Sequence, residues 1–171
     1  SVLGTASQNT SDPQCFQLTQ ENNFSMGAVW SELPLDLSQS FEIVTDVSFG
    51  CISSPENGGD GIAFVLQNQG NIEPTVIGGG LGYDGISPSL AVQFDTYRDN
   101  PVDYPGVSDP GGGPFSLPYY DHVGLMKNGS ISHGTSDDLG TVPFSPFFLD
   151  VEDCTTYSNQ QITISWNTTS S

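Results

Sequence analysis

Residues 89–97 read SLAVQFDTY, and this stretch decides the fold class. Side chains in a strand alternate between two faces, so Leu90, Val92 and Phe94 fall on one face. Gln93 and Asp95 fall on the opposite face together with small or aromatic neighbours. This period of two predicts a β-strand rather than a helix. The strand leads into residues 98–121, a segment dense in Asp, Pro and Gly. So long a loop in a compact domain is usually either functional or disordered.

The rest of the chain repeats this strand-and-turn pattern. Residues 38–49 alternate clearly, 61–67 form an apolar run typical of a strand buried on both faces, and 161–166 alternate again. The turn Asn128-Gly129 predicts a hairpin between 123–127 and 130–133. No helix, repeat or linker is evident. We therefore predict an all-β domain of two packed antiparallel sheets, a sandwich or jelly roll, over residues 15–171, preceded by a polar N-terminal arm over residues 1–14.

The charge balance limits the function classes. Twenty acidic residues face two basic ones, Arg98 and Lys127, which gives a net charge of −18. Such a surface repels the phosphates of nucleic acid and of anionic membranes. It suits cation binding, although simple solubility would explain it equally well. No apolar run reaches the roughly 18 residues of a membrane span, so we expect no membrane insertion.

Other features predict a secreted or cell-surface protein. The chain begins at Ser1 without Met, as a mature or excised segment would, and it carries four Asn-X-Ser/Thr sequons. Its cysteines, Cys15, Cys51 and Cys154, form no CxxC motif. We expect one disulfide, Cys15–Cys51, with Cys154 pairing outside this segment or staying free. Three buried thiols are the alternative.

An acidic cluster follows the central strand. Five aspartates and one asparagine lie within residues 95–121 beside a single base. Hard cations such as calcium take six to eight oxygen ligands, and clustered carboxylates without a cation repel one another. A solvated acidic loop is the alternative explanation.

Four sequence blocks occur in a recognisable order: DGIAFVL at 60–66, GGGLGY at 78–83, LAVQFDTY at 90–97 and DHVGL at 121–125. On these blocks the chain resembles the L-type (legume-like) lectins, particularly bacterial secreted and adhesin-borne members, over roughly residues 15–170. The resemblance implies a concanavalin-like two-sheet jelly roll that binds glycans with the help of calcium.

The resemblance also implies a sugar-binding pocket. Asp60, following Gly59 at a bond that is often cis in the family, would accept hydrogen bonds from two sugar hydroxyls. Gly79 or Gly80 would offer a backbone N–H at close approach. An Asn after the FDT-like motif would contact both sugar and calcium. Asp99 has its spacing and Asn100 its chemistry, and we prefer Asn100. An aromatic ring from the long loop would stack on the sugar, with Tyr97 as one candidate.

The metal ligands follow from the same resemblance. They are the side chain of Asp95, the carbonyl of Tyr97, the Asp99 or Asn100 position, and a later Asp that is either Asp109 or Asp121. Many relatives hold a second, transition-metal ion through a Glu and a His. Here Gln93 replaces that Glu beside His122, and a neutral amide is a poorer ligand, which puts the second ion in doubt. His133 is expected to be only a hairpin residue.

Two other functions compete with lectin activity. A calcium-stiffened spacer in a large adhesin would need no sugar site. A jelly-roll glycoside hydrolase would need two nearby carboxyls, but the central strand offers Gln93 and Asp95, so we expect no enzyme. Finally, NTTSS at 167–171 reads as a turn with no return strand. We therefore expect the last strands of the sandwich to come from a complementing chain or a C-terminal segment.

Overall fold

The computed structural model describes residues 1–20, 22–50, 59–99, 109–110, 121–143 and 159–168. Within these ranges the chain is almost entirely β-structure, with ten strands and one short 3₁₀ helix, η1 (Gly78–Gly80). None of the described segments is a helix long and apolar enough to cross a membrane. The predicted all-β class is confirmed.

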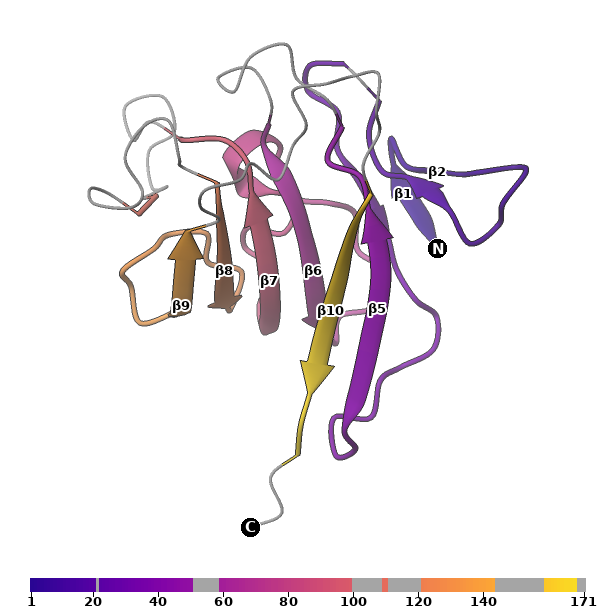
Figure 1. Cartoon of the computed structure of the whole chain (residues 1–171). Helices are drawn as coiled ribbons and strands as arrows, with labels where there is room; N and C mark the ends of the chain where they lie inside the picture. Colours follow the sequence, from indigo (N-terminus) through magenta and orange to yellow (C-terminus); the bar gives the residue numbers. More distant parts are fainter. Residues whose placement is uncertain (21, 51–58, 100–108, 111–120, 144–158, 169–171) are drawn as a thin grey trace.

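The main sheet has four antiparallel strands in the order β6-β7-β8-β9 (Figure 1). Their bounds are β6 Gly61–Gln67, β7 Ser89–Asp95, β8 His122–Lys127 and β9 Asp138–Pro143. The register pairs Gly61 with Asp95, Asp95 with His122, and His122 with Pro143. Asp95 and His122 therefore lie side by side at one end of the sheet.

The predicted hairpin is correct in its turn and wrong in its second strand. Asn128 and Gly129 adopt φ values of 60° and 69°, the left-handed pair of a type I′ turn. The strand that pairs with β8 is β9, however, because residues 130–133 leave the sheet and bury Ile131 and His133 beneath it. Burial of these two side chains outweighs immediate strand pairing.

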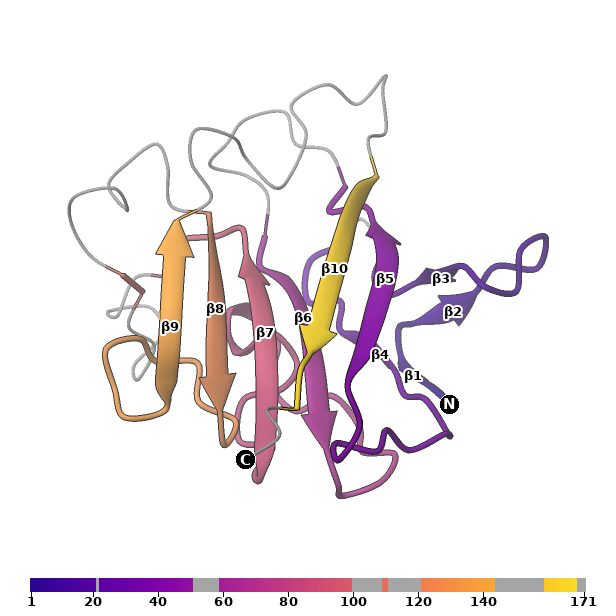
Figure 2. The same ribbon diagram turned by 60° about the horizontal axis from the view of Figure 1, so that its bottom comes forward.

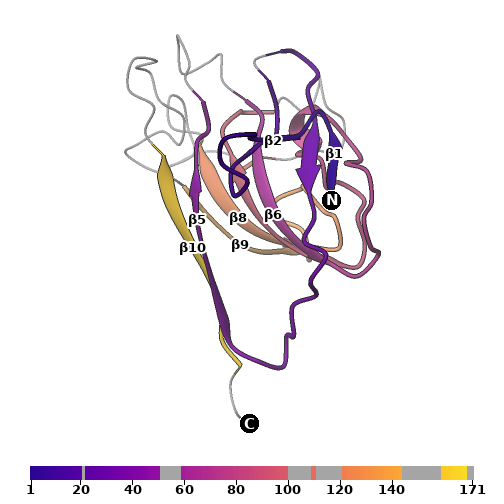
Figure 3. The ribbon, with the colours of Figure 1, turned by 90° about the vertical axis from the view of Figure 1, so that its right-hand side faces the viewer.

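A second layer consists of β5 (Phe41–Val47) and β10 (Gln160–Trp166), paired antiparallel (Figures 2 and 3). Half-buried and exposed residues alternate along β10 and along the first four residues of β5. The Phe41 and Trp166 rings stack with centroids 6.4 Å apart. Between the layers lies an apolar cavity of about 160 Å³. Its lining comes from both sheets: Phe41, Phe64, Leu66, Leu90, Val92, Leu125, Ile164, Ser165 and Trp166. The predicted sandwich is thus confirmed.

Two short strand pairs complete the described elements. β1 (Val2–Gly4) pairs with β4 (Gly27–Val29), and β2 (Ser7–Gln8) pairs with β3 (Phe16–Gln17). The residues expected as an N-terminal arm therefore contribute two paired strands. Cys15 is exposed and free, which contradicts the predicted disulfide. The other two cysteines lie outside the described residues.

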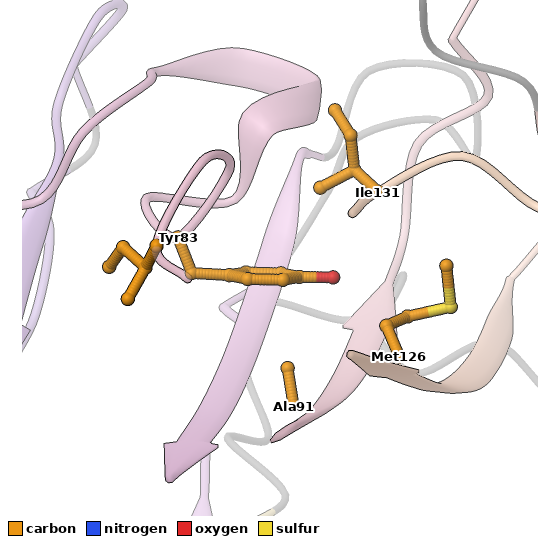
Figure 4. Packing of buried hydrophobic residues seen from close by; sticks show 5 residues of the cluster. Tyr83, Ala91, Met126 and Ile131 are labelled. Carbon is orange, nitrogen blue, oxygen red and sulfur yellow. The ribbon is translucent and has the colours of Figure 1, made fainter. Parts of the chain in front are cut away.

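The opposite face of the main sheet carries the best-buried core (Figure 4). Tyr83, Ile86, Ala91, Met126 and Ile131 form this cluster. Ala91 pairs with Met126 across β7 and β8, and the next two pairs along the same face are Gln93 with Gly124 and Asp95 with His122. On this face of the sheet the apolar core is followed directly by polar side chains, and these lie at the end of the sheet where the site is.

Candidate functional site

Three carboxylates converge at the end of β7. Asp95, only 3% exposed, ends the strand and accepts a hydrogen bond from the Tyr97 amide at 3.0 Å. Asp99 and Asp109 join it, and one carboxyl oxygen of each residue lies within 4.8 Å of the others. The Asp99 amide donates to Asp109 Oδ2 at 2.5 Å, which ties the two loop segments together.

This cluster is electrostatically unsatisfied. Burial raises the pKa of Asp99 to about 6 and that of Asp109 to about 7. Burial, followed by repulsion from Asp109, raises the pKa of Asp95 well above its ordinary value. Asp99 Oδ2 and Asp109 Oδ1 are buried and have no hydrogen-bond partner within the part of the chain that the structure describes. Arg98 beside them is exposed. Buried carboxylate oxygens that lack protein donors require a proton or a cation, so the residues fit a metal ion.

The glycine loop lies directly against the cluster. A Cβ atom added to Gly79 would lie 1.8 Å from Asp99 Oδ2, so only glycine allows this approach. Gly80 beside it is also buried. These positions confirm that η1 and the carboxylates form one continuous region, although they do not by themselves assign a ligand.

Asp60 and Tyr97 border the same region. The peptide bond between Gly59 and Asp60 is cis, the arrangement that the resemblance implied. The Asp60 carbonyl accepts from the Thr96 amide at 2.9 Å, while burial raises the pKa of the Asp60 carboxyl. Its charge in turn raises the pKa of Asp99. Tyr97 packs over Gly59 but stays 40% exposed, so part of its ring faces solvent.

A nitrogen-rich group adjoins the carboxylates. His122 and His133 approach with their Nε2 atoms 2.9 Å apart, and Gln93 Nε2 lies 2.9 Å from His133 Nε2. All three side chains are buried. Asp109 can join the two histidines around one point, just as it joins Asp95 and Asp99. The expectation that His133 is only a hairpin residue is wrong, because its buried side chain contacts His122 and Gln93.

The structure gathers most of the predicted residues. At this end of the sheet lie eight of them: Asp60, Gly79, Gly80, Asp95, Tyr97, Asp99, Asp109 and His122. Asp121 is buried but belongs to neither possible metal group, which favours Asp109 as the later ligand. Asn100 lies outside the described residues. His133 was missed because no local pattern indicates that it folds back onto Gly124, where an added Cβ would lie 3.1 Å from the imidazole.

Comparison with known proteins agrees with this geometry. The sequence model of the family described as legume lectin beta-barrel domain matches residues 1–171, the whole chain. The chain belongs to the L-type lectin family. A pesticidal crystal protein of Bacillus thuringiensis, Cry22Aa, is 33% identical over 105 residues. The alignment covers 61% of this lectin domain but only 14% of that protein. Domains of this family bind carbohydrate, generally hold metal ions and are generally not enzymes.

Proposed function

We propose that this lectin domain binds carbohydrate in a calcium-dependent manner and belongs to a secreted or cell-surface protein, where it serves as an adhesin. The observation that carries the proposal is the convergence of Asp95, Asp99 and Asp109, two of which bury carboxylate oxygens without partners. Oxygen-only clusters of this kind favour a hard cation such as calcium over softer ions. The strongly acidic surface, with a net charge of −18, suits the same environment.

In this proposal the calcium site and the sugar-binding pocket are adjacent. Asp95, Asp99 and Asp109 hold calcium, with the Tyr97 carbonyl and Asn100 as further ligands. Asp60 accepts hydrogen bonds from the sugar, the loop at Gly79 and Gly80 approaches it through the backbone, and the exposed part of the Tyr97 ring offers a stacking surface. Support comes from the contact of Gly79 with Asp99 and from the repulsion between Asp60 and Asp99.

A glycan array with calcium and with chelator tests the proposal, and Asp60→Asn sharpens it. The substitution replaces one acceptor oxygen with an NH₂ group. Loss of a charge-assisted hydrogen bond costs roughly 1.5–3 kcal/mol, about ten- to a hundredfold in affinity. We expect calorimetry to show retained calcium binding and lost glycan binding. Asp46→Asn on the exposed face of β5 is the matched control. Equal glycan affinity in Asp60→Asn and the parent would refute the pocket.

The same experiment separates the alternatives. A calcium-stiffened spacer would bind calcium and no glycan on any array. We also propose that the domain binds sugar without cleaving it. Incubation with the best array hit should release no reducing sugar, and steady release that Asp95→Asn abolishes would instead establish a hydrolase.

We further propose that a complementing chain or C-terminal segment adds strands beside β10. β10 pairs with β5 along one edge, and among the described residues no strand pairs with its other edge. Leu125 and Val142 lie on the inter-sheet face yet are 39% and 60% exposed. Amide exchange in β10 should slow when the complementing strands are present, whether on the same chain or added as a separate one. Identical exchange with and without them would refute the proposal.

A further inference from the structure

We infer that Thr75 is a positioning residue for sugar binding, because its hydroxyl closes the glycine loop (residues 75–84) that carries Gly79 and Gly80. In the proposed function this loop approaches the sugar through its backbone, and the role of Thr75 therefore rests on that function. The bonds that close the loop need no metal ion, so this half of the pocket is ordered before calcium binds.

The two legs of the loop meet at Thr75 and Gly82. The Thr75 amide donates to the Gly82 carbonyl at 3.0 Å, and the Gly82 amide donates back to the Val76 carbonyl at 2.9 Å. Between these bonds the chain turns tightly, and the Leu81 amide donates to the Gly78 carbonyl at 2.9 Å. Gly82 has a φ of 72°, which residues with a side chain rarely adopt. The loop is therefore a narrow hairpin with η1 at its tip.

The Thr75 hydroxyl adds a bond that the backbone alone does not supply. It donates to the Asp84 carbonyl at 2.6 Å, and it lies 3.3 Å from the Gly82 carbonyl oxygen. The first residue of the loop is thus joined to the last one. Thr75 itself is exposed, so loss of its hydroxyl creates no cavity in the core.

The other leg of the loop is fixed by the core. Tyr83 is 1% exposed and belongs to the buried cluster of Figure 4. The Tyr83 and Asp84 amides both donate to the Gly80 carbonyl, at 3.0 and 3.1 Å. The Thr75 hydroxyl therefore ties the leg at residues 75–77 to a leg that the core already holds, and this fixes the position of the glycines between them.

Calcium and Thr75 act on opposite sides of the pocket. The bonds that close the loop join backbone groups and one hydroxyl, and none of them uses a carboxylate. The ion cluster meets the loop at Gly79, where an added Cβ would lie 1.8 Å from Asp99 Oδ2. We expect calcium to order the Asp99 side and Thr75 to order the glycine side. Loss of the hydroxyl should therefore weaken sugar binding while calcium binding is kept.

Thr75→Val tests this division, because valine has nearly the same shape and lacks the hydroxyl. The calcium-saturated protein should be titrated by calorimetry with the best glycan-array hit. We expect the glycan affinity to fall about two- to tenfold, as for the loss of one neutral hydrogen bond, with the calcium affinity unchanged. Thr75→Ser, which keeps the hydroxyl, should bind as the parent does. Thr5→Val is the matched control, because exposed Thr5 donates to the Leu18 carbonyl at 3.2 Å outside the loop.

Amide exchange provides a measurement that needs no glycan. In chelator, the Leu81 and Gly82 amides should exchange slowly in the parent, Thr75→Ser and Thr5→Val proteins, and several-fold faster in Thr75→Val. Equal glycan affinity in Thr75→Val and the parent would overturn the inference, as would equal exchange of these amides or a parallel loss of calcium affinity. A parent that binds no glycan would refute the proposed function instead, and the exchange comparison would still decide whether Thr75 closes the loop.

Discussion

Gly79 has only a hydrogen atom where other residues have a Cβ, and the glycine loop can therefore pack against the carboxylates. An added Cβ would lie 1.8 Å from Asp99 Oδ2, far inside contact distance. In Gly79→Ala, Asp99 must therefore move away from Asp95 and Asp109. We expect calcium affinity to fall at least tenfold, measured by calorimetry.

Gly140→Ala is the matched control for this substitution, because nothing lies within 4 Å of the added Cβ on β9. It should bind calcium as the parent does. Unchanged calcium affinity in Gly79→Ala would show that Asp99 is not a ligand, and would return that role to Asn100.

The residues that could be predicted are those fixed by strand ends. Asp95 and His122 terminate paired strands, so the sheet register alone places them together. The choice between Asp109 and Asp121 could not be made, because it depends on the path of the long loop, which has no periodicity. His133 was missed for a similar reason: its partners Gln93 and Thr141 belong to other strands.

At the level of elements, alternation predicted β5, β7 and β10 closely, and the continuous apolar run predicted β6. The partner of β8 was predicted wrongly because residues 130–133 follow the turn but leave the sheet, and Ile131 is buried there instead of pairing with β8. Local turn chemistry fixes where a strand ends; it does not fix which strand pairs next.

The two-stranded layer depends on a few inward side chains, since an isolated strand pair is marginally stable. Trp166 stacks on Phe41 and donates from Nε1 to the Leu37 carbonyl at 2.9 Å. Trp166→Ala should lower the free energy of unfolding by roughly 2 kcal/mol, about half the cost at a fully buried site. Urea unfolding measures this loss.

Thr163→Ala on the outer face of β10 should cost far less than Trp166→Ala. Both variants should keep the parent's calcium affinity, because the carboxylates lie beyond the opposite face of the main sheet. A parallel loss of calcium binding in Trp166→Ala would mean that the second layer supports the site directly.

Across the whole molecule, the raised carboxyl pKa values make stability depend on pH. The folded state holds these protons more tightly than the unfolded state, so deprotonation favours unfolding. In chelator, thermal stability should be highest near pH 4 and fall as pH rises through about 6 and 7, the pKa values of Asp99 and Asp109. The lowered pKa of Asp138 has the opposite effect: it contributes stability that is lost only when the pH falls below the ordinary value of 3.8.

Calcium should reverse this trend, because its affinity rises as the same carboxyls lose their protons. Thermal unfolding across pH 4 to 8, with chelator and with excess calcium, measures both slopes. Asp109→Asn should flatten the decline in chelator. A metal-free protein that becomes more stable between pH 5 and 7 would contradict the assignment of this pH dependence to the raised pKa values of Asp99 and Asp109.

Because basic residues are scarce, this domain has very few cleavage sites for a protease that recognises Lys and Arg. A protease that cuts only after Lys and Arg has two target bonds in 171 residues, and one of them joins exposed Arg98 to the cluster residue Asp99. Digestion of the calcium-free domain should release fragments 1–98 and 99–171. Calcium should slow that cleavage because Asp99 must leave its ligands before the bond can enter a protease. Mass spectrometry of a timed digest would then report occupancy of the ion site without any label, and the half-buried Lys127 serves as the internal reference.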